Sequence, residues 1–349
     1  MSVQWEVTLL SIHTSEAGTS LFANGQMQVA ANVLIKAINP ANYDPYMLTA
    51  AELARIELVD YYNTDEKLTG PWRFTSAENE FSHTMPPGTG FIADAEEPPT
   101  RPFMVDQSKR YWVSTTRAEV KSVGARIAQP NGKVITTRSP ENNSYIAFRG
   151  YQEIRYSLSN SEWWREDTDS GSGWDQDNYF LRSRVHPFIR ADRTGYSSDT
   201  FPVVGMRNSV AYHRAGPHLH YMWPIGGRAT VKAGLTHYAD GRVHPKAWSR
   251  DIVIRQHANS LCLTRLKTSG PLGIWDLGWW YYPTATMYDQ YGNSGTFELA
   301  VNEYNTISIH NRGTKSRPPS DTPHYEDEKT IPDAEIGESE SSVHEPPTD

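Results

Sequence analysis

The clearest pattern in the chain is a regular alternation of apolar and polar residues over residues 27–37. Successive side chains of a β-strand point to opposite faces, so a period of two is typical of a strand that buries one face. The dipeptide Asn24-Gly25, which suits a tight turn, precedes this segment. We therefore expect its odd-numbered residues to be buried and Gln28, Asn32 and Lys36 to be exposed.

Other segments show the same pattern more briefly. Apolar residues alternate over residues 5–9, which predicts a strand beside the first one. Residues 123–127 lead into Pro130-Asn131-Gly132, after which residues 133–137 are rich in β-branched side chains, and this order predicts a hairpin. Short β-like runs separated by Gly, Pro or Asn continue downstream, at residues 210–213, 218–223, 229–238, 252–257, 261–266, 297–301 and 307–309.

One short helix is predicted. Thr49 and Glu52 have the spacing of a capping box, in which each side chain bonds the backbone N–H of the other residue. The β-like residues 56–62 follow closely, so the helix has room for one or two turns. Strands therefore dominate the whole prediction.

The segment Leu21-Phe22-Ala23-Asn24-Gly25-Gln26-Met27-Gln28-Val29, which opens the alternating strand, resembles the start of bacterial immunoglobulin-like domains of the invasin and intimin type. The shared features are an Ala-Asn-Gly turn and a long alternating strand. The next turn of that family, Asp-Gly or Gly-Asn, is here Asn39-Pro40-Ala41-Asn42. The resemblance implies a β-sandwich that serves as a spacer or adhesive module, and it implies no catalytic residues.

The fold class that we predict is all-β, with two domains and a tail. An immunoglobulin-like β-sandwich would occupy residues 1–157, and a second antiparallel β-rich domain would occupy residues 179–313. Residues 158–178 are rich in acidic residues, Gly, Ser and Trp, which favours a linker or loop. Residues 314–349 contain mainly Pro, Ser, Glu and Asp, and a chain with so few apolar residues cannot offset its conformational entropy, so we expect a disordered acidic tail. Residues 86–102 have the composition of a long surface loop.

Charge and cysteine content narrow the function classes. The net charge of −8 and the lack of a Lys/Arg run argue against nucleic acid as a partner, because phosphate binding needs a concentrated basic face. Cys262 is the only cysteine, so no intrachain disulfide is expected. No signal peptide or apolar transmembrane segment is recognisable. We expect synthesis in the cytoplasm, with release by lysis or a dedicated apparatus if the protein acts outside the cell.

Acidic residues crowd residues 167–177, around the bend Gly171-Ser172-Gly173. Calcium prefers several oxygen ligands, so the sequence permits a calcium site there. The segment lacks the Glu at the twelfth position that an EF-hand loop requires, and a solvated acidic loop is the alternative interpretation. The candidate ligands are Asp167, Asp169, Asp175 and Asp177.

Histidines gather in the second half of the chain. His218 and His220 would share one face of a strand, where two imidazoles can hold zinc or iron. No third ligand has a fixed local spacing, so ordinary packed histidines are the alternative. The other members of the group are His213, His237 and His244.

Candidates for nucleophilic or nucleotide chemistry are weak. The chain has no Gly-x-Ser-x-Gly motif, and Cys262 lies between two leucines, where a thiol usually behaves as a small buried apolar group. No Gly-rich phosphate loop joins a strand to a helix. The sequence therefore gives no reason to expect a nucleotide cofactor.

Two aromatic clusters are candidates for ligand contact, Trp163-Trp164 and Trp279-Trp280 with the tyrosines that follow it. In a strand, alternate members face opposite sides, so one set can fill a core while the other meets a ligand. Exposed Trp rings can stack on sugars or enter an interface. Core packing is the alternative.

These features favour a non-enzymatic binding or assembly protein that acts through aromatic and loop surfaces, plausibly a bacterial host-interaction or toxin-associated factor. Its expected partner is a protein or a carbohydrate. One alternative is a metal- or carboxylate-dependent hydrolase acting on a polysaccharide, and another is an oligomerising structural or pore-forming component. Convergence of the five histidines would favour the hydrolase.

Overall fold

A computed structural model describes residues 4–14, 18–87, 107–194, 218–237, 243–268, 284–301 and 306–312. As predicted, this part of the chain is nearly all β, and its strands form several sheets that are antiparallel except where β2 runs parallel to β10. The predicted disordered tail, residues 314–349, and most of the predicted loop, residues 86–102, lie outside the described residues.

The chain divides into two compact units. Unit 1 comprises Met1–Ile154 and Gln290–Asn293, and unit 2 comprises Arg155–Asp289 and Ser294–Asp349.

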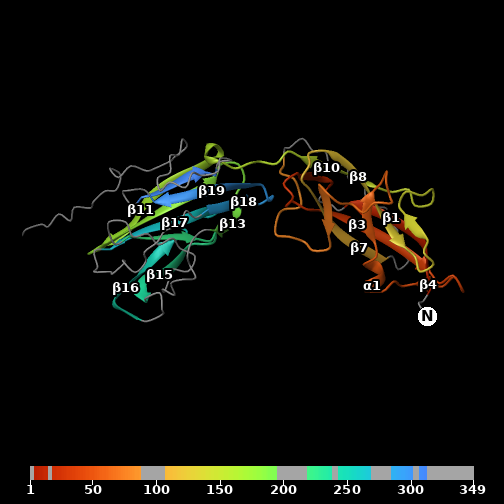
Figure 1. The fold of residues 1–349 in the computed structure, drawn as a ribbon, viewed down its shortest axis with the longest axis horizontal. Helices are drawn as coiled ribbons and strands as arrows, with labels where there is room; N and C mark the ends of the chain where they lie inside the picture. The colour runs from red at the N-terminus through yellow and green to blue at the C-terminus, as the bar shows by residue number, and fades with distance from the viewer. Residues whose placement is uncertain are drawn as a thin grey trace, which may run out of the picture. The chain divides into compact units, whose positions relative to one another are not determined.

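Unit 1 contains two sheets (Figure 1). The first has the order β1 (Glu6–Thr14), β3 (Val29–Ile38), β7 (Gln107–Thr115) and β6 (Trp72–Thr75), with β4 (Pro45–Tyr46) beside β3. The second has the order β2 (Ser20–Phe22), β10 (Ile146–Tyr151), β8 (Val120–Ala128) and β5 (Glu57–Asp60), with β9 (Val134–Thr136) beside β8. Apolar residues of both sheets belong to one core, so unit 1 is a β-sandwich. Whether it belongs to the immunoglobulin-like class stays a prediction.

The burial of β3 confirms half of its predicted pattern. Every odd-numbered residue from Met27 to Ala37 is buried, as the alternation requires. The other half is wrong, because Gln28 is buried, and Asn32 and Lys36 are half-buried rather than exposed. The Gln28 side chain accepts a hydrogen bond from the backbone of Asn79 and donates one to Ala77, so a loop covers this end of the outer face.

The pattern of β1 changes phase within the strand. The pairing with β3 shifts register between Val7 and Leu9, which marks a β-bulge. Beyond the bulge, Leu10 and Ile12 face the core, while Leu9 is only half-buried. The simple alternation predicted for residues 5–9 therefore fails at Leu9, because the extra residue rotates the rest of the strand by one position.

Two local predictions for unit 1 are confirmed. The helix α1 spans Ala50–Leu53, and Thr49 and Glu52 form the capping box at its start. β8 and β9 form the predicted hairpin, and Gly132 in its turn has φ of 84°, a left-handed conformation that glycine adopts without steric cost.

Unit 2 contains two four-stranded sheets and a two-stranded ribbon (Figure 1). A short 3-10 helix, η1 (Leu158–Asn160), precedes them. The first sheet has the order β11 (Ser161–Gly171), β12 (Trp174–Ser183), β17 (Ser260–Thr268) and β14 (His218–Trp223). The second has the order β13 (Phe188–Thr194), β18 (Thr284–Asp289), β19 (Ser294–Val301) and β20 (Ile307–Asn311). The ribbon consists of β15 (Ala229–His237) and β16 (Val243–Ile254).

The ribbon packs on one face of the β11-β12-β17-β14 sheet. Ala233, Ile252 and Ile254 of the ribbon form one apolar cluster with sheet residues such as Phe180 and Tyr221. The Tyr221 hydroxyl also accepts a hydrogen bond of 3.0 Å from the backbone N–H of Gly234 in β15. The face of this sheet that carries even-numbered residues of β12 is therefore covered by the ribbon over part of its area.

The structure corrects the interpretation of residues 158–178 as a linker or loop. β11 and β12 pair in antiparallel register from Ser161 and Ser183 to Gly171 and Trp174, so this segment is the first hairpin of unit 2. The acidic and Gly-rich composition that favoured a loop belongs to the exposed end of the hairpin. Gly173, in the two-residue turn, has φ of 79°.

Candidate functional site

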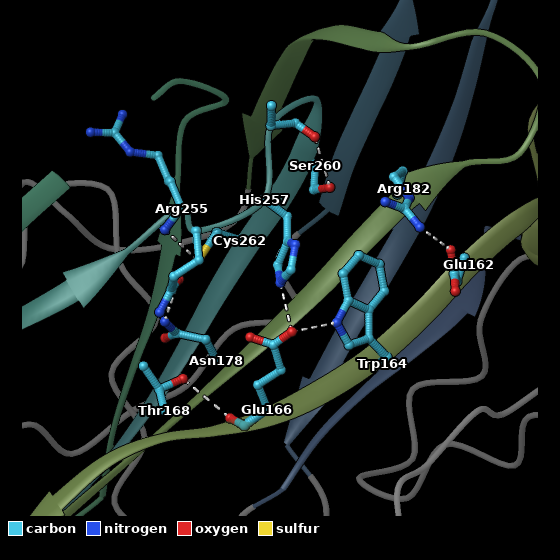
Figure 2. A network of polar contacts seen from close by, with 12 residues as sticks. Glu162, Trp164, Glu166, Thr168, Asn178, Arg182, Arg255, His257, Ser260 and Cys262 are labelled. Atoms are coloured by element: carbon cyan, nitrogen blue, oxygen red, sulfur yellow. Dashed lines mark hydrogen bonds and ion pairs between the residues drawn. The ribbon is translucent and has the colours of Figure 1, made fainter. Parts of the chain in front are cut away.

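The candidate site lies on β11, β12 and the turn between β16 and β17. We call it the Trp164 surface, and it consists of Glu162, Trp164, Glu166, Arg182 and His257 (Figure 2). Glu162, Trp164 and Glu166 alternate along β11 and so share a face. Their cross-strand partners in β12 are Arg182, Phe180 and Asn178. β11 is the outermost strand of its sheet in the described part of the chain.

The Trp164 ring forms the centre of this surface and is half-buried. It stacks on Phe180 with centroids 5.2 Å apart, and the Arg182 guanidinium lies 5.1 Å from its centroid. The edge of His257 meets it at 5.2 Å. Since Phe180 and Arg182 both belong to β12, these two ring contacts come from the inner neighbour of the edge strand.

Two polar contacts flank this ring, the Glu162–Arg182 ion pair and the Glu166–His257 hydrogen bond. The Glu162 carboxylate lies 2.7 Å from Arg182, and the Glu166 carboxylate lies 2.6 Å from His257 Nε2. The Trp164 indole N–H donates to the same Glu166 oxygen at 3.1 Å. These four side chains are 35% to 46% exposed, so both pairs are accessible to solvent and to a partner.

The buried side-chain amide of Asn178 holds the turn that carries His257. Asn178 in β12 donates to the Val253 carbonyl and to the Gln256 side chain, at 2.9 and 3.0 Å. Arg255 and Asn259, on either side of His257, have φ of 58° and 59°. Such left-handed conformations are uncommon for side-chain-bearing residues and persist where the surrounding structure fixes them. The position of His257 is therefore fixed by its turn and by Asn178.

This arrangement offers limited catalytic chemistry. His257 resembles a general base and Glu166 the carboxylate that orients it. However, no described Ser, Thr or Cys side chain is hydrogen-bonded to His257. Ser260, at the end of the same turn, is buried and donates to the Ala258 carbonyl. Among the described residues, the surface has polar groups for binding without an adjacent nucleophile.

Cys262 lies on β17 directly across from Phe180 and is buried, as its position between two leucines predicts. Burial raises the pKa of its thiol to about 12. The backbone N–H of Arg255 points at its sulfur, 3.4 Å away (Figure 2). The thiol therefore stays protonated near neutral pH.

We expect the Cys262 thiol to react with Ellman's reagent only when the protein unfolds, because the thiolate is the nucleophile and the folded chain suppresses it. The measurement is the release of thionitrobenzoate from native and from guanidinium-unfolded protein. Unfolded protein should release one equivalent per chain, since Cys262 is the only cysteine. Rapid release from native protein would contradict the burial of this thiol.

The four proposed calcium ligands do not converge. Asp177 is buried in an ion pair with Arg265, whose Nε donates at 2.6 Å, and Arg165 lies 3.8 Å away on its other oxygen. Asp175 contacts the same arginine at 3.3 Å. Asp167 and Asp169 are exposed on β11. Within the described ranges, no group of three His, Cys, Asp or Glu residues is placed to hold a metal ion.

The histidine group is only partly described. His218 and His220 lie on β14 as the strand prediction requires, and His220 is buried beside the Arg265 position of β17. His237 lies on β15 and His244 on β16, in the ribbon rather than in the sheet of β14. His213 lies outside the described residues. The metal site at His218 and His220 stays a prediction.

The two members of the first Trp pair have different roles, as their adjacent positions in a strand require. Trp164 belongs to the surface described above. Trp163 faces the other side of the sheet, where it stacks on Tyr179 at 5.6 Å. Trp279 and Trp280 lie outside the described residues.

Four residues of the surface were missed by the sequence analysis, namely Glu162, Glu166, Arg182 and His257. The alternation of Glu162, Trp164 and Glu166 was present in the sequence, and a strand assignment for this segment would have put them on one face. His257 had no such signal, because it approaches Glu166 only through the pairing of β12 with β17.

Comparison with known proteins gives no family for this chain. No protein-family model matches it, and a search of curated proteins finds no relative. In the part of the chain that the structure describes, no helix is long and apolar enough to cross a bilayer.

Proposed function

We propose that the protein is a non-enzymatic binding protein and that two copies of the chain associate through the Trp164 surface of unit 2. The observation that carries this proposal is an aromatic centre on an edge strand, flanked by the Glu162–Arg182 ion pair and the Glu166–His257 hydrogen bond. Protein interfaces have this anatomy, with Trp and Arg as frequent energetic centres and a polar rim around them. Among the described residues, no strand pairs with the outer edge of β11, which leaves room for a partner beside the ring.

The balance of charge favours a second copy over an unrelated partner. The surface carries two carboxylates opposed by Arg182 and His257. In an interface with twofold symmetry the same patch meets itself, so a patch with both signs is self-complementary. Glu162 of one copy can then meet Arg182 of the other. A sugar partner is less favoured at this position, because Phe180 and Arg182 already contact the ring on which it would stack.

The hydrolase alternative has one supporting observation, the Glu166–His257 pair at 2.6 Å. A pair of catalytic carboxylates would need to lie roughly 5 to 10 Å apart in a glycosidase. Glu162 and Glu166 are four residues apart on one strand, which separates their backbones by about 13 Å. The two glutamates of this surface are therefore poorly placed to act together on one glycosidic bond.

Sedimentation velocity of the full chain over a concentration series tests the proposal. We expect a concentration-dependent dimer, and Trp164→Ala should weaken it by about tenfold or more, as loss of an interface centre does. Glu162→Arg alone should also weaken the dimer. Adding Arg182→Glu should restore it, because the exchange recreates, with reversed charges, the two symmetric ion pairs between position 162 of one copy and position 182 of the other. Arg184→Ala is the control, since Arg184 is exposed and lies outside the surface. A monomer at every concentration would refute the assembly proposal.

A further inference from the structure

A second surface, in unit 1, carries exposed aromatic side chains. We call it the tyrosine–arginine patch, and it consists of Tyr61, Tyr62, Arg138, Asn143 and Tyr145. These residues either follow β5 or lie in the connection between β9 and β10, so two segments distant in sequence meet beside β8. Tyr62 and Tyr145 are 67% and 50% exposed, which is high for large aromatic residues.

The Tyr61 ring contacts the other two rings of the patch. Tyr61 lies between the other two, with its centroid 5.4 Å from Tyr62 at an interplanar angle of 82° and 4.7 Å from Tyr145 at 36°. The Tyr61 hydroxyl donates to Asn143 at 2.5 Å. Tyr61 is thereby fixed, and it supports the two exposed rings from inside the patch.

Arg138 is fixed over these rings. Its guanidinium lies 5.8 Å from the centroids of both Tyr61 and Tyr62, and one terminal nitrogen donates to the Tyr62 carbonyl at 2.7 Å. Arginine has five N–H donors in a rigid fork. The remaining guanidinium donors of Arg138 have no partner among the described residues, and the residue is exposed. A positioned guanidinium with free donors is suited to bind a carboxylate through two parallel hydrogen bonds.

We propose that this patch binds a pyranose sugar that carries one carboxylate. The carboxylate would accept hydrogen bonds from Arg138, and the apolar C–H face of the ring would lie on Tyr62 or Tyr145, with the phenol hydroxyls available to sugar hydroxyls. Aromatic side chains offer this combination of an apolar ring and a polar end. The site is distinct from the Trp164 surface, so it stands whether or not that surface mediates assembly.

The charges around the patch favour one acidic sugar over an acidic peptide. Asp65 and Glu66 follow Tyr62 closely and Glu141 lies between Arg138 and Tyr145, and all three carboxylates are exposed. They would repel a chain with many negative charges, whereas a ligand with a single carboxylate meets the one guanidinium. The Tyr62 and Tyr145 rings would then supply the remaining contact with the sugar.

The test uses the full chain and a matched pair of ligands, methyl β-D-glucuronide and methyl β-D-glucoside, which differ in the carboxylate. Titration followed by ligand-observed NMR should give a Kd on the order of millimolar for the glucuronide, as expected of a ligand this small. The glucoside should bind at least tenfold more weakly. The methyl α-glycoside of N-acetylneuraminic acid, a second pyranose with one carboxylate, is the additional probe, and binding of either acidic sugar supports the proposal.

Variants locate the binding. Arg138→Ala should weaken glucuronide binding by about tenfold or more, and Arg138→Lys should restore only part of it, because lysine keeps the charge but not the fork. Tyr62→Ala should weaken binding of both the acidic and the neutral sugar. The control is Arg73→Ala, an exposed arginine outside the patch. Unchanged melting temperatures would show that each variant folds.

Three results would overturn the proposal. The first is that neither acidic sugar binds at tens of millimolar. The second is that Arg138→Ala binds as tightly as the unmodified chain. The third is that a hexaglutamate peptide binds more tightly than the glucuronide at a site that Arg138→Ala removes, which would assign the patch to acidic peptides.

Discussion

The substitution Val33→Asp is expected to unfold unit 1. Val33 is fully buried in the core between the two sheets, and an aspartate there would place an unpaired carboxylate among apolar side chains. The group must either remain charged at high cost or take up a proton, and either outcome costs several kcal/mol of the free energy of unfolding. Urea unfolding followed by circular dichroism measures this loss.

The neighbouring substitution Asn32→Asp is the matched control for Val33→Asp. Asn32 lies on the opposite face of β3 and accepts a hydrogen bond of 3.0 Å from Arg110, which a carboxylate at this position would keep. Its effect should stay within about 0.5 kcal/mol. Equal losses for the two variants would contradict the orientation of β3.

The substitution Asp177→Asn is expected to destabilise unit 2 by about 3 to 5 kcal/mol, since it removes the negative member of a buried ion pair while preserving the size of the side chain. The side chains of Asp177 and Arg265 are only 2% and 3% exposed. Burial raises the pKa of the Asp177 carboxyl, and the neighbouring Arg265 and Arg165 guanidinium groups oppose that shift. Thermal unfolding of the full chain monitors the loss.

Asp167→Asn is the matched control, because Asp167 lies directly across the hairpin from Asp177 but is exposed. We expect it to change stability by about 0.5 kcal/mol at most. Addition of millimolar calcium should leave the melting temperature of the unmodified protein unchanged. A calcium-dependent rise that Asp167→Asn abolishes would restore the calcium site and contradict this account.

Local signals in the sequence predicted the local structure well. The alternation in β3, the turn at Gly132 and the capping box at Thr49 each depend on residues within one element. The bulge in β1 could not be predicted in the same way, because the change of phase after Val7 is defined by the register with β3. The local pattern therefore predicts the secondary-structure elements, whereas strand pairing decides which side chains of a strand face the core.

The site was harder to predict because unit 2 buries polar residues in its strands. Gln176, Asp177 and Asn178 are adjacent in β12 and all buried, so the segment reads as polar although it lies inside the protein. The side-chain amides of Gln176 and Asn178 both donate to the Val253 carbonyl of the ribbon, and Asp177 accepts from Arg265. These partners are 75 or more residues away in the chain, and a sequence alone does not reveal such pairings.

The turn Gln290–Asn293 belongs to unit 1, although it follows most of unit 2 in the sequence, and this affects the order of folding during synthesis. Tyr291 is a buried member of the unit 1 core, and the Asn24 side chain donates to its carbonyl at 2.9 Å. The ribosome releases a chain from the N-terminus onwards, and domains generally fold as they emerge. Unit 1 is discontinuous in sequence, so its core lacks a member until most of unit 2 has been translated. Unit 1 begins to emerge first but is completed only just before β19 and β20 of unit 2 are translated.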